Sequence, residues 1–148
     1  MEYRIAKAYL DSILNARRQI IRLELSIERL EHEMTYPAVT VGGDRVQSSP
    51  AGDALERRVI KYVELLEKHR KAYIRRKTSY EEKLYDAESH IMLLPDGKPK
   101  TFLLEHYIDG VSELDYGITH GYETTVSVYN LKIRAVRLFA NFFEKKWW

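Results

Sequence analysis

The stretch EYRIAKAYLDSILNARRQIIRLELSIERLEHEM, residues 2–34, decides the fold class because its apolar residues recur in steps of three and four. That spacing places them on one stripe of an α-helix, while Arg and Glu fill the other positions. A single helix cannot bury such a stripe alone, so the pattern predicts a long amphipathic helix with a helical partner. The stripe consists of Ala6, Tyr9, Ile13, Ala16, Ile20, Leu23, Ile27, Leu30 and Met34.

Residues 54–94 form a second helical stretch, and in the simplest arrangement it is that partner. The spacing is interrupted near His69 and at 76–78, which predicts either one helix with a polar middle or a break near 75–79. Two such helices form an antiparallel hairpin within the chain or a coiled coil between chains. The stripe contains Leu55, Val59, Tyr62, Leu66, Tyr73, Tyr80, Leu84, Ala87 and Ile91.

Residues 35–53 are rich in Pro, Gly and small polar residues, so they are predicted to be a linker within a helical region 1–94. Its AVTV segment, 38–41, suits a short strand or an extended chain. Ser48, Ser49 or Asp53 is a candidate cap for the second helix.

Residues 95–148 are predicted to be a separate helix-turn-helix module. The order is a turn at 93–100, a short helix over 101–109, a second over about 113–120 and a longer one from about 125 to 145. Phe102, Leu103, His106 and Tyr107 are available for a core. Gly110 and Gly121 are expected to turn the chain, and Ser112 and Thr124 to cap the helices that follow. The expected buried stripe of the last helix is Val128, Leu131, Ala135, Leu138 and Phe142.

Composition excludes several classes of protein. The chain has 148 residues, of which 45% are hydrophobic, enough for a core, and its net charge of +2 means that any nucleic-acid contact must come from local clusters. The absence of cysteine excludes disulfides and thiolate metal sites and suits a cytoplasmic protein. The N-terminus has no apolar signal core, and no run approaches the roughly 18 apolar residues of a membrane span. The five histidines lack a metal-ligand spacing, and no catalytic or cofactor motif is present, so we expect no metal, no cofactor and no enzyme.

The last helix carries residue types suited to a DNA groove. Asn pairs with adenine, Arg with guanine or phosphate, and Thr hydroxyls at a helix start with phosphate. The candidate DNA-binding residues are Thr124, Thr125, Val126, Tyr129, Asn130, Lys132, Arg134 and Arg137.

Two further segments are candidate contact surfaces. The segment KHRKAYIRRK, residues 68–77, has six Lys or Arg residues and no acid, so it is either a nucleic-acid contact or a solvated helix surface. Trp147 and Trp148 are expected to pack on the long helices or to contact a partner or a second copy. The secondary basic strip is Lys68, Arg70, Lys71, Arg75, Arg76 and Lys77.

The segments HYIDGVS (106–112) and GYETTVSVYNLKIRAV (121–136) resemble the C-terminal part of phage late-transcription regulators of the ArpU/RinA type, which are similar to region 4 of sigma-70 factors. Tyr107 to Ser112 match the family's Tyr-Ile-x-Gly-x-Ser opening, and Thr124 stands where the family has its capping Ser. Ser127-Val128-Tyr129 stand at its Thr-Val-Tyr, and Arg134-Ala135-Val136 at its Arg-Ala-Leu. The segment QSSPAGDALERRVIKYVELLE, residues 47–67, resembles the opening of the family's second helix.

The resemblance implies a phage transcriptional regulator in the cytoplasm of a host bacterial cell. The expected partners are double-stranded DNA, RNA polymerase or another host protein, and a second copy of the chain in a homodimer. The short helix departs from the family, since Glu113 to Ile118 replace Trp-x-x-Ile-Ala and Gly117 costs about 1 kcal/mol relative to Ala. Residues 101–123 also carry five acids and no Lys or Arg. The alternative is therefore a non-enzymatic phage protein that binds and inhibits or redirects a host complex through a repurposed helix-turn-helix scaffold.

Overall fold

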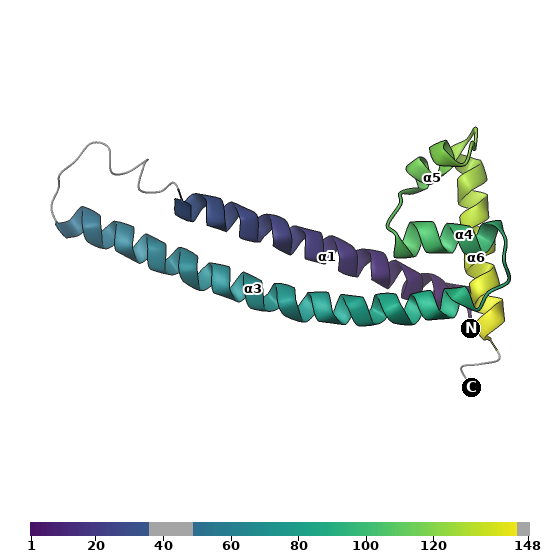
Figure 1. The fold of residues 1–148 in the computed structure, drawn as a ribbon, viewed down its shortest axis with the longest axis horizontal. Coiled ribbons are helices and arrows are strands. Elements are labelled where there is room, and N and C mark those ends of the chain that lie inside the picture. Colours follow the sequence, from purple (N-terminus) through teal and green to yellow (C-terminus); the bar gives the residue numbers. More distant parts are fainter. Residues whose placement is uncertain (36–48, 145–148) are drawn as a thin grey trace. The chain divides into compact units, whose positions relative to one another are not determined.

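The computed structural model describes residues 1–35 and 49–144, and all its regular elements are helical (Figure 1). No strand occurs in these two ranges, so the predicted all-α fold class is confirmed. The AVTV segment, Ser48, Trp147 and Trp148 lie outside the described residues. The elements are α1 (Tyr3–Thr35), α3 (Ser49–Met92), α4 (Lys98–Leu103), the π-helical turn η1 (Leu104–Ile108), α5 (Glu113–Thr119) and α6 (Thr125–Phe143).

The chain divides into two compact units, and both long helices contribute to each. We call Arg18–Thr78 the hairpin unit, and Met1–Arg17 together with the chain from Ser79 onward the C-terminal unit. By their contacts, the start of α1 and the end of α3 thus group with α4 to α6. The division into domains 1–94 and 95–148 stays a prediction.

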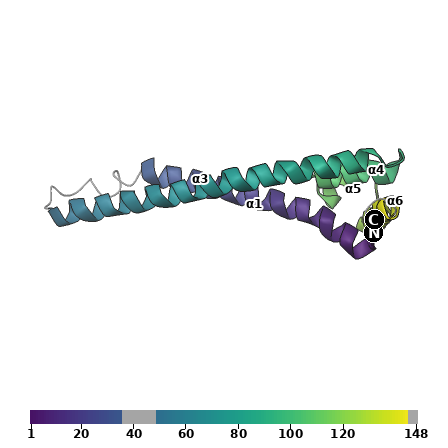
Figure 2. The same cartoon turned by 90° about the horizontal axis from the view of Figure 1, so that it is seen from below.

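The hairpin unit pairs α1 with α3 in antiparallel order, as Figures 1 and 2 both show for this stretch. The Tyr73 hydroxyl donates to Glu24 at 2.9 Å, and Arg70 pairs with Glu31 at 2.6 Å. The helix α3 runs unbroken through residues 75–79, so the alternative with one helix and a polar middle is confirmed. It begins at Ser49, so the end of the predicted linker is helical; Pro50 is tolerated there because the first turn needs no intrahelical N–H donor.

The interior of the hairpin unit is thin. In its described part, the buried residues are Ile20, Leu30 and Leu66. Leu23 and Ile27 of the predicted stripe are half-buried between them. The stripe of α1 therefore faces its partner as expected, but most side chains of this unit remain in contact with water.

The main core lies in the C-terminal unit, where the first turns of α1 and the last turns of α3 meet α4, η1, α5 and α6. Aromatic rings fill much of it: Tyr9 stacks on Phe139 with centroids 5.9 Å apart, and Phe102 meets Tyr116 edge to face at 5.1 Å. Its largest fully buried side chains are Tyr107, Tyr116, Phe102, Phe139, Phe143, Leu10, Ile13, Ile91, Leu103, Leu131 and Val136.

The expected stripe of α6 is correct in its first half and shifted in its second. Val128, Leu131 and Ala135 are buried, whereas Leu138 and Phe142 are only half-buried. The reason is that the long helices also cover α6 from the side, as the edge contact of Phe143 with His90 at 5.1 Å shows. The residues buried by this wider coverage are Val136, Phe139, Ala140 and Phe143.

The short helix expected over 101–109 begins earlier and changes its pitch. It starts at Lys98, because Pro99 in the first turn costs no hydrogen bond, and it widens into the π-helical turn η1 at Leu104. The caps and turns expected in this part of the chain are present. Gly110 and Gly121 have φ of 77° and 75°, and the hydroxyls of Ser112 and Thr124 accept the backbone N–H of Asp115 and Ser127.

Arg17 joins three elements of the C-terminal unit at Gly110. Its Nη2 donates to the Ile108 carbonyl at 2.7 Å and its Nε to the Tyr80 hydroxyl at 3.0 Å. A Cβ on Gly110 would lie 1.3 Å from Arg17 Nη1. Glycine is therefore required here for its positive φ and also for the space that the guanidinium occupies.

We expect Gly110→Ala to destabilise the protein more than Gly121→Ala. Both replacements place Ala at positive φ, which costs about 1–2 kcal/mol. A Cβ on Gly121 meets nothing within 4 Å, whereas one on Gly110 displaces Arg17 and its charge-assisted hydrogen bond, which is worth about 1.5–3 kcal/mol. Equal losses in the free energy of urea-induced unfolding for the two variants would contradict this role of Arg17.

Candidate nucleic-acid interface

The first three turns of α6 present a continuous exposed face. Thr125, Val126, Tyr129, Asn130 and Arg134 lie on it, with Tyr129 54% exposed. Thr124 caps the helix at its start and is also exposed. Among the residues that the structure describes, Arg134 makes no ion pair, so its guanidinium is open to an external anion.

Two of the candidate cations on α6 are engaged within the protein. Lys132 is turned toward α5, where its Nζ lies 2.6 Å from Glu113 Oε1 and its side chain is only 17% exposed. We therefore leave Lys132 out of the proposed contact surface. Arg137 is exposed, but its guanidinium lies over the ring of Tyr3, 5.9 Å from the centroid. Arg134 and Arg137 remain as the cations of this face.

Two of the five acidic side chains in residues 101–123 have partners within the protein. Glu105 Oε2 lies 2.7 Å from His120 Nε2, and Glu113 pairs with Lys132. Asp109, Asp115 and Glu123 remain exposed. In the described part of the folded protein, Lys132 balances the charge of Glu113, so the acidity that counts against DNA binding is reduced by one side chain.

Gly117 brings α5 close to α6. It is buried, and a Cβ there would lie 3.0 Å from Val128 Cγ2. The helix α5 stays continuous through this residue. Gly117 lowers the helix propensity of α5, but it also allows the tight contact between α5 and α6. The sequence alone did not predict this contact.

An apolar hollow of about 390 Å³ lies between α5 and the start of α6. Leu114 and Ile118 line it and are 62% and 71% exposed. Glu123 and Thr124 stand at the same hollow. Exposed Leu and Ile side chains around a surface hollow are more typical of a contact with protein than with phosphate.

His106 is buried beside the turn between η1 and α5, where its Nδ1 donates to the Val111 carbonyl at 2.7 Å. Burial is the largest influence on it and lowers the pKa of the imidazole below 6.5. Its ring stacks on Phe102. Nδ1 is thus occupied by the backbone, and no group of three His, Asp or Glu side chains that could hold a metal ion is found in the described ranges.

The lowered pKa of His106 predicts a loss of stability in mild acid. The unfolded chain takes up the proton more readily than the folded one, so stability is lost as pH falls from 6.5 toward the lower pKa of the folded state, by up to about 1.4 kcal/mol per pH unit. In His106→Asn, a side chain that does not titrate replaces the imidazole, so this contribution should vanish. The measurement is the difference in unfolding free energy between pH 7 and pH 5; the same difference in both proteins would contradict the assignment.

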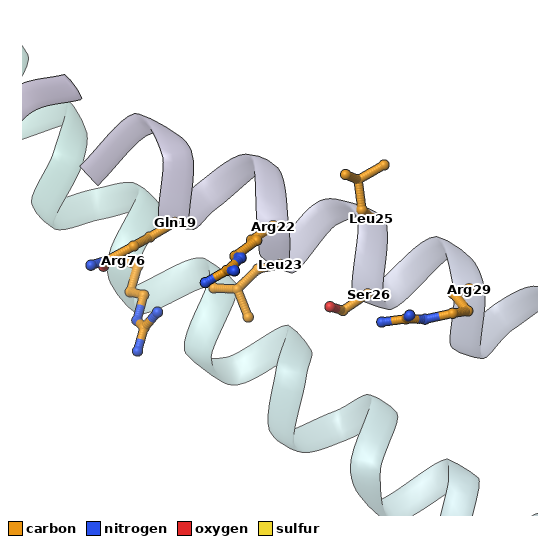
Figure 3. Close-up of a pocket in the computed structure, with 7 residues that line it drawn as sticks. All are labelled: Gln19, Arg22, Leu23, Leu25, Ser26, Arg29 and Arg76. Atoms are coloured by element: carbon orange, nitrogen blue, oxygen red, sulfur yellow. The ribbon is translucent and has the colours of Figure 1, made fainter. Parts of the chain in front are cut away.

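The basic strip 68–77 is exposed along α3, but its cations do not act alike. Arg70 is paired with Glu31, and Lys77 lies over the Tyr73 ring at 5.6 Å. Arg76 instead lines a groove of about 670 Å³ together with residues of α1 (Figure 3). The sequence analysis placed Arg76 in the basic strip, but it did not identify the residues of α1 that lie beside Arg76 in the groove. The groove is lined by Gln19, Arg22, Leu23, Leu25, Ser26, Arg29 and Arg76.

No protein-family model, curated protein or solved structure matches this chain. No helix within residues 1–35 and 49–144 has the length and apolarity needed to cross a lipid bilayer. The resemblance to ArpU/RinA-type regulators therefore stays a prediction, and the assignment of function rests on the geometry of the described residues.

Proposed function

We propose that the chain is a transcriptional regulator of the phage type that binds double-stranded DNA through the exposed face of α6. The observation that carries the proposal is the cluster on this face of a capping Thr124, the polar Thr125 and Asn130, and the unpaired Arg134. A helix capped at its start and exposed over its first turns suits insertion into a major groove, which admits an α-helix.

The roles within this face follow from residue chemistry and position. Asn130 and Tyr129 are proposed to meet base edges, since Asn offers both a donor and an acceptor to adenine. Arg134 and Arg137 lie one and two turns further along and are proposed to contact phosphate. Thr124 and Thr125 are proposed to hold a phosphate at the helix start. A homodimer would let two such helices bind two half-sites, and contact with RNA polymerase belongs to the same proposal.

The experiment is a mobility-shift and fluorescence-anisotropy titration of the full chain with duplex DNA from the genomic neighbourhood of its gene. We expect affinity to fall steeply with salt, and Arg134→Gln to reduce the slope of log K against log salt by about 0.9, the value for one lost phosphate contact. The double variant Glu113→Gln/Lys132→Gln keeps the net charge and removes an internal pair, so it should leave the slope unchanged. A slope that responds to the double variant but not to Arg134→Gln would overturn the proposal.

Asn130→Ala tests base recognition separately. We expect it to reduce the preference for the specific duplex over a scrambled one by about 1–3 kcal/mol, because it removes base contacts. The salt slope should stay near that of the unmodified protein, since Asn130 carries no charge. An equal loss of affinity for both duplexes would assign Asn130 to a structural or backbone role instead.

The apolar hollow between α5 and α6 favours a second candidate function, the binding of a host protein. Leu114 and Ile118 are exposed at this hollow, and Val126 and Tyr129 are further exposed apolar side chains at the start of α6. In that case Leu114→Ser/Ile118→Ser should abolish capture of the host complex, while Arg134→Gln should leave it intact. Trp147→Ala/Trp148→Ala tests the terminal aromatics in the same assay.

A further inference from the structure

The hairpin unit separates its charges onto two edges. Successive residues of a helix turn by about 100°, so positions 22 and 29 of α1 lie on one side of the buried stripe and positions 24, 28 and 31 on the other. On the acidic edge, Glu24 accepts from Tyr73 and Glu31 pairs with Arg70. On the basic edge, Arg22 and Arg29 stand beside Gln19 and Ser26 and are joined by Arg76 of α3.

The three guanidinium groups of this groove have no internal counter-charge. Arg22, Arg29 and Arg76 are exposed, and none of them forms an ion pair among the residues that the structure describes. Glu33 follows Arg29 by four residues on α1, and no ion pair joins the two in the described part of the chain. Glu24 and Glu31 are thus bonded within the hairpin, whereas these three arginines form no ion pair in the described residues and are open to an external anion.

We propose that this groove binds the phosphodiester backbone of a nucleic acid, independently of α6. Arg22 and Arg29 are seven residues apart, about 10 Å along the helix axis, a distance that one strand of a duplex covers in about three nucleotide steps. The planar guanidinium donates two parallel N–H groups to a phosphate, and Gln19 and Ser26, which line the same groove, offer further donors.

A nucleic acid suits the groove better than an acidic protein does. Protein interfaces centre on apolar and aromatic side chains. Here Leu23 is half-buried against the hairpin interior, and Leu25 points away from the arginines (Figure 3). Because the contacts are to phosphate, the groove is expected to bind without sequence preference. It would add affinity, while any reading of bases belongs to α6.

The test is the salt dependence of binding of the full chain to labelled duplex and single-stranded DNA of random sequence. Arg22→Gln/Arg29→Gln/Arg76→Gln should lower the slope of log K against log salt by about 2.7 on duplex, that is about 0.9 for each of three phosphates. The matched control Arg57→Gln/Arg58→Gln/Lys61→Gln removes the same charge from exposed positions of the same unit outside the groove, and should lower it by less than one. Equal effects of the two triple variants would overturn the inference.

Two further arms keep the test decisive. The triple Arg→Lys variant of the groove retains the charge and should keep the slope, which excludes a loss of folding as the cause; helical content is compared by circular dichroism. Polyglutamate serves as the acidic-protein probe. If the groove variant loses polyglutamate binding but keeps DNA binding, the groove is a protein site and the inference fails.

The outcome is separable from that of the α6 proposal. If the groove variant lowers the slope and Arg134→Gln does not, the groove binds nucleic acid and the proposed role of α6 fails. If Arg134→Gln lowers the slope and the groove variant does not, the further inference fails and the role of α6 stands.

Discussion

The C-terminal unit depends on the guanidinium of Arg17. The end of a helix leaves carbonyl groups without N–H partners, and the π-helical turn η1 ends at Ile108, whose carbonyl accepts from Arg17. The same side chain donates to Tyr80 of α3 and occupies the space above Gly110. One cation of α1 thereby fixes the end of η1 and the turn into α5, and α5 in turn lies beside the start of α6.

The exposed surface of α6 is what remains after its other sides are packed against, or paired with, the rest of the C-terminal unit. On the buried side, Val128 meets Gly117, and later turns are covered by the long helices through Phe139 and Phe143. Lys132 lies between the two sides and is held by Glu113. What remains outward is an exposed strip of Thr, Tyr, Asn and Arg that is suited to an external ligand, although Arg137 at its end also lies over the Tyr3 ring.

The groove of the hairpin unit is likewise formed by side chains that have no ion-pair partner among the described residues. A thin two-helix interior leaves most charged side chains exposed, so their pairing is decided by which edge of the hairpin they occupy. Acids opposite Tyr73 and Arg70 are satisfied, whereas Arg22, Arg29 and Arg76 are not. If both proposals hold, the chain carries a phosphate-binding surface on each unit, and only that on α6 has residues suited to reading bases.

The sequence by itself determined the fold class, the two long helices, and the caps and turns at Gly110, Ser112, Gly121 and Thr124, because these follow from local spacing and local backbone chemistry. Only the tertiary structure decided that Lys132 is engaged by Glu113 and that α6 buries Val136, Phe139 and Phe143 beyond its expected stripe. It also brought Arg76 to Arg22 and Arg29, which lie more than forty residues away in sequence. Periodicity reports which side of a helix is apolar, but the partner of a charged side chain is set by which helix packs beside it.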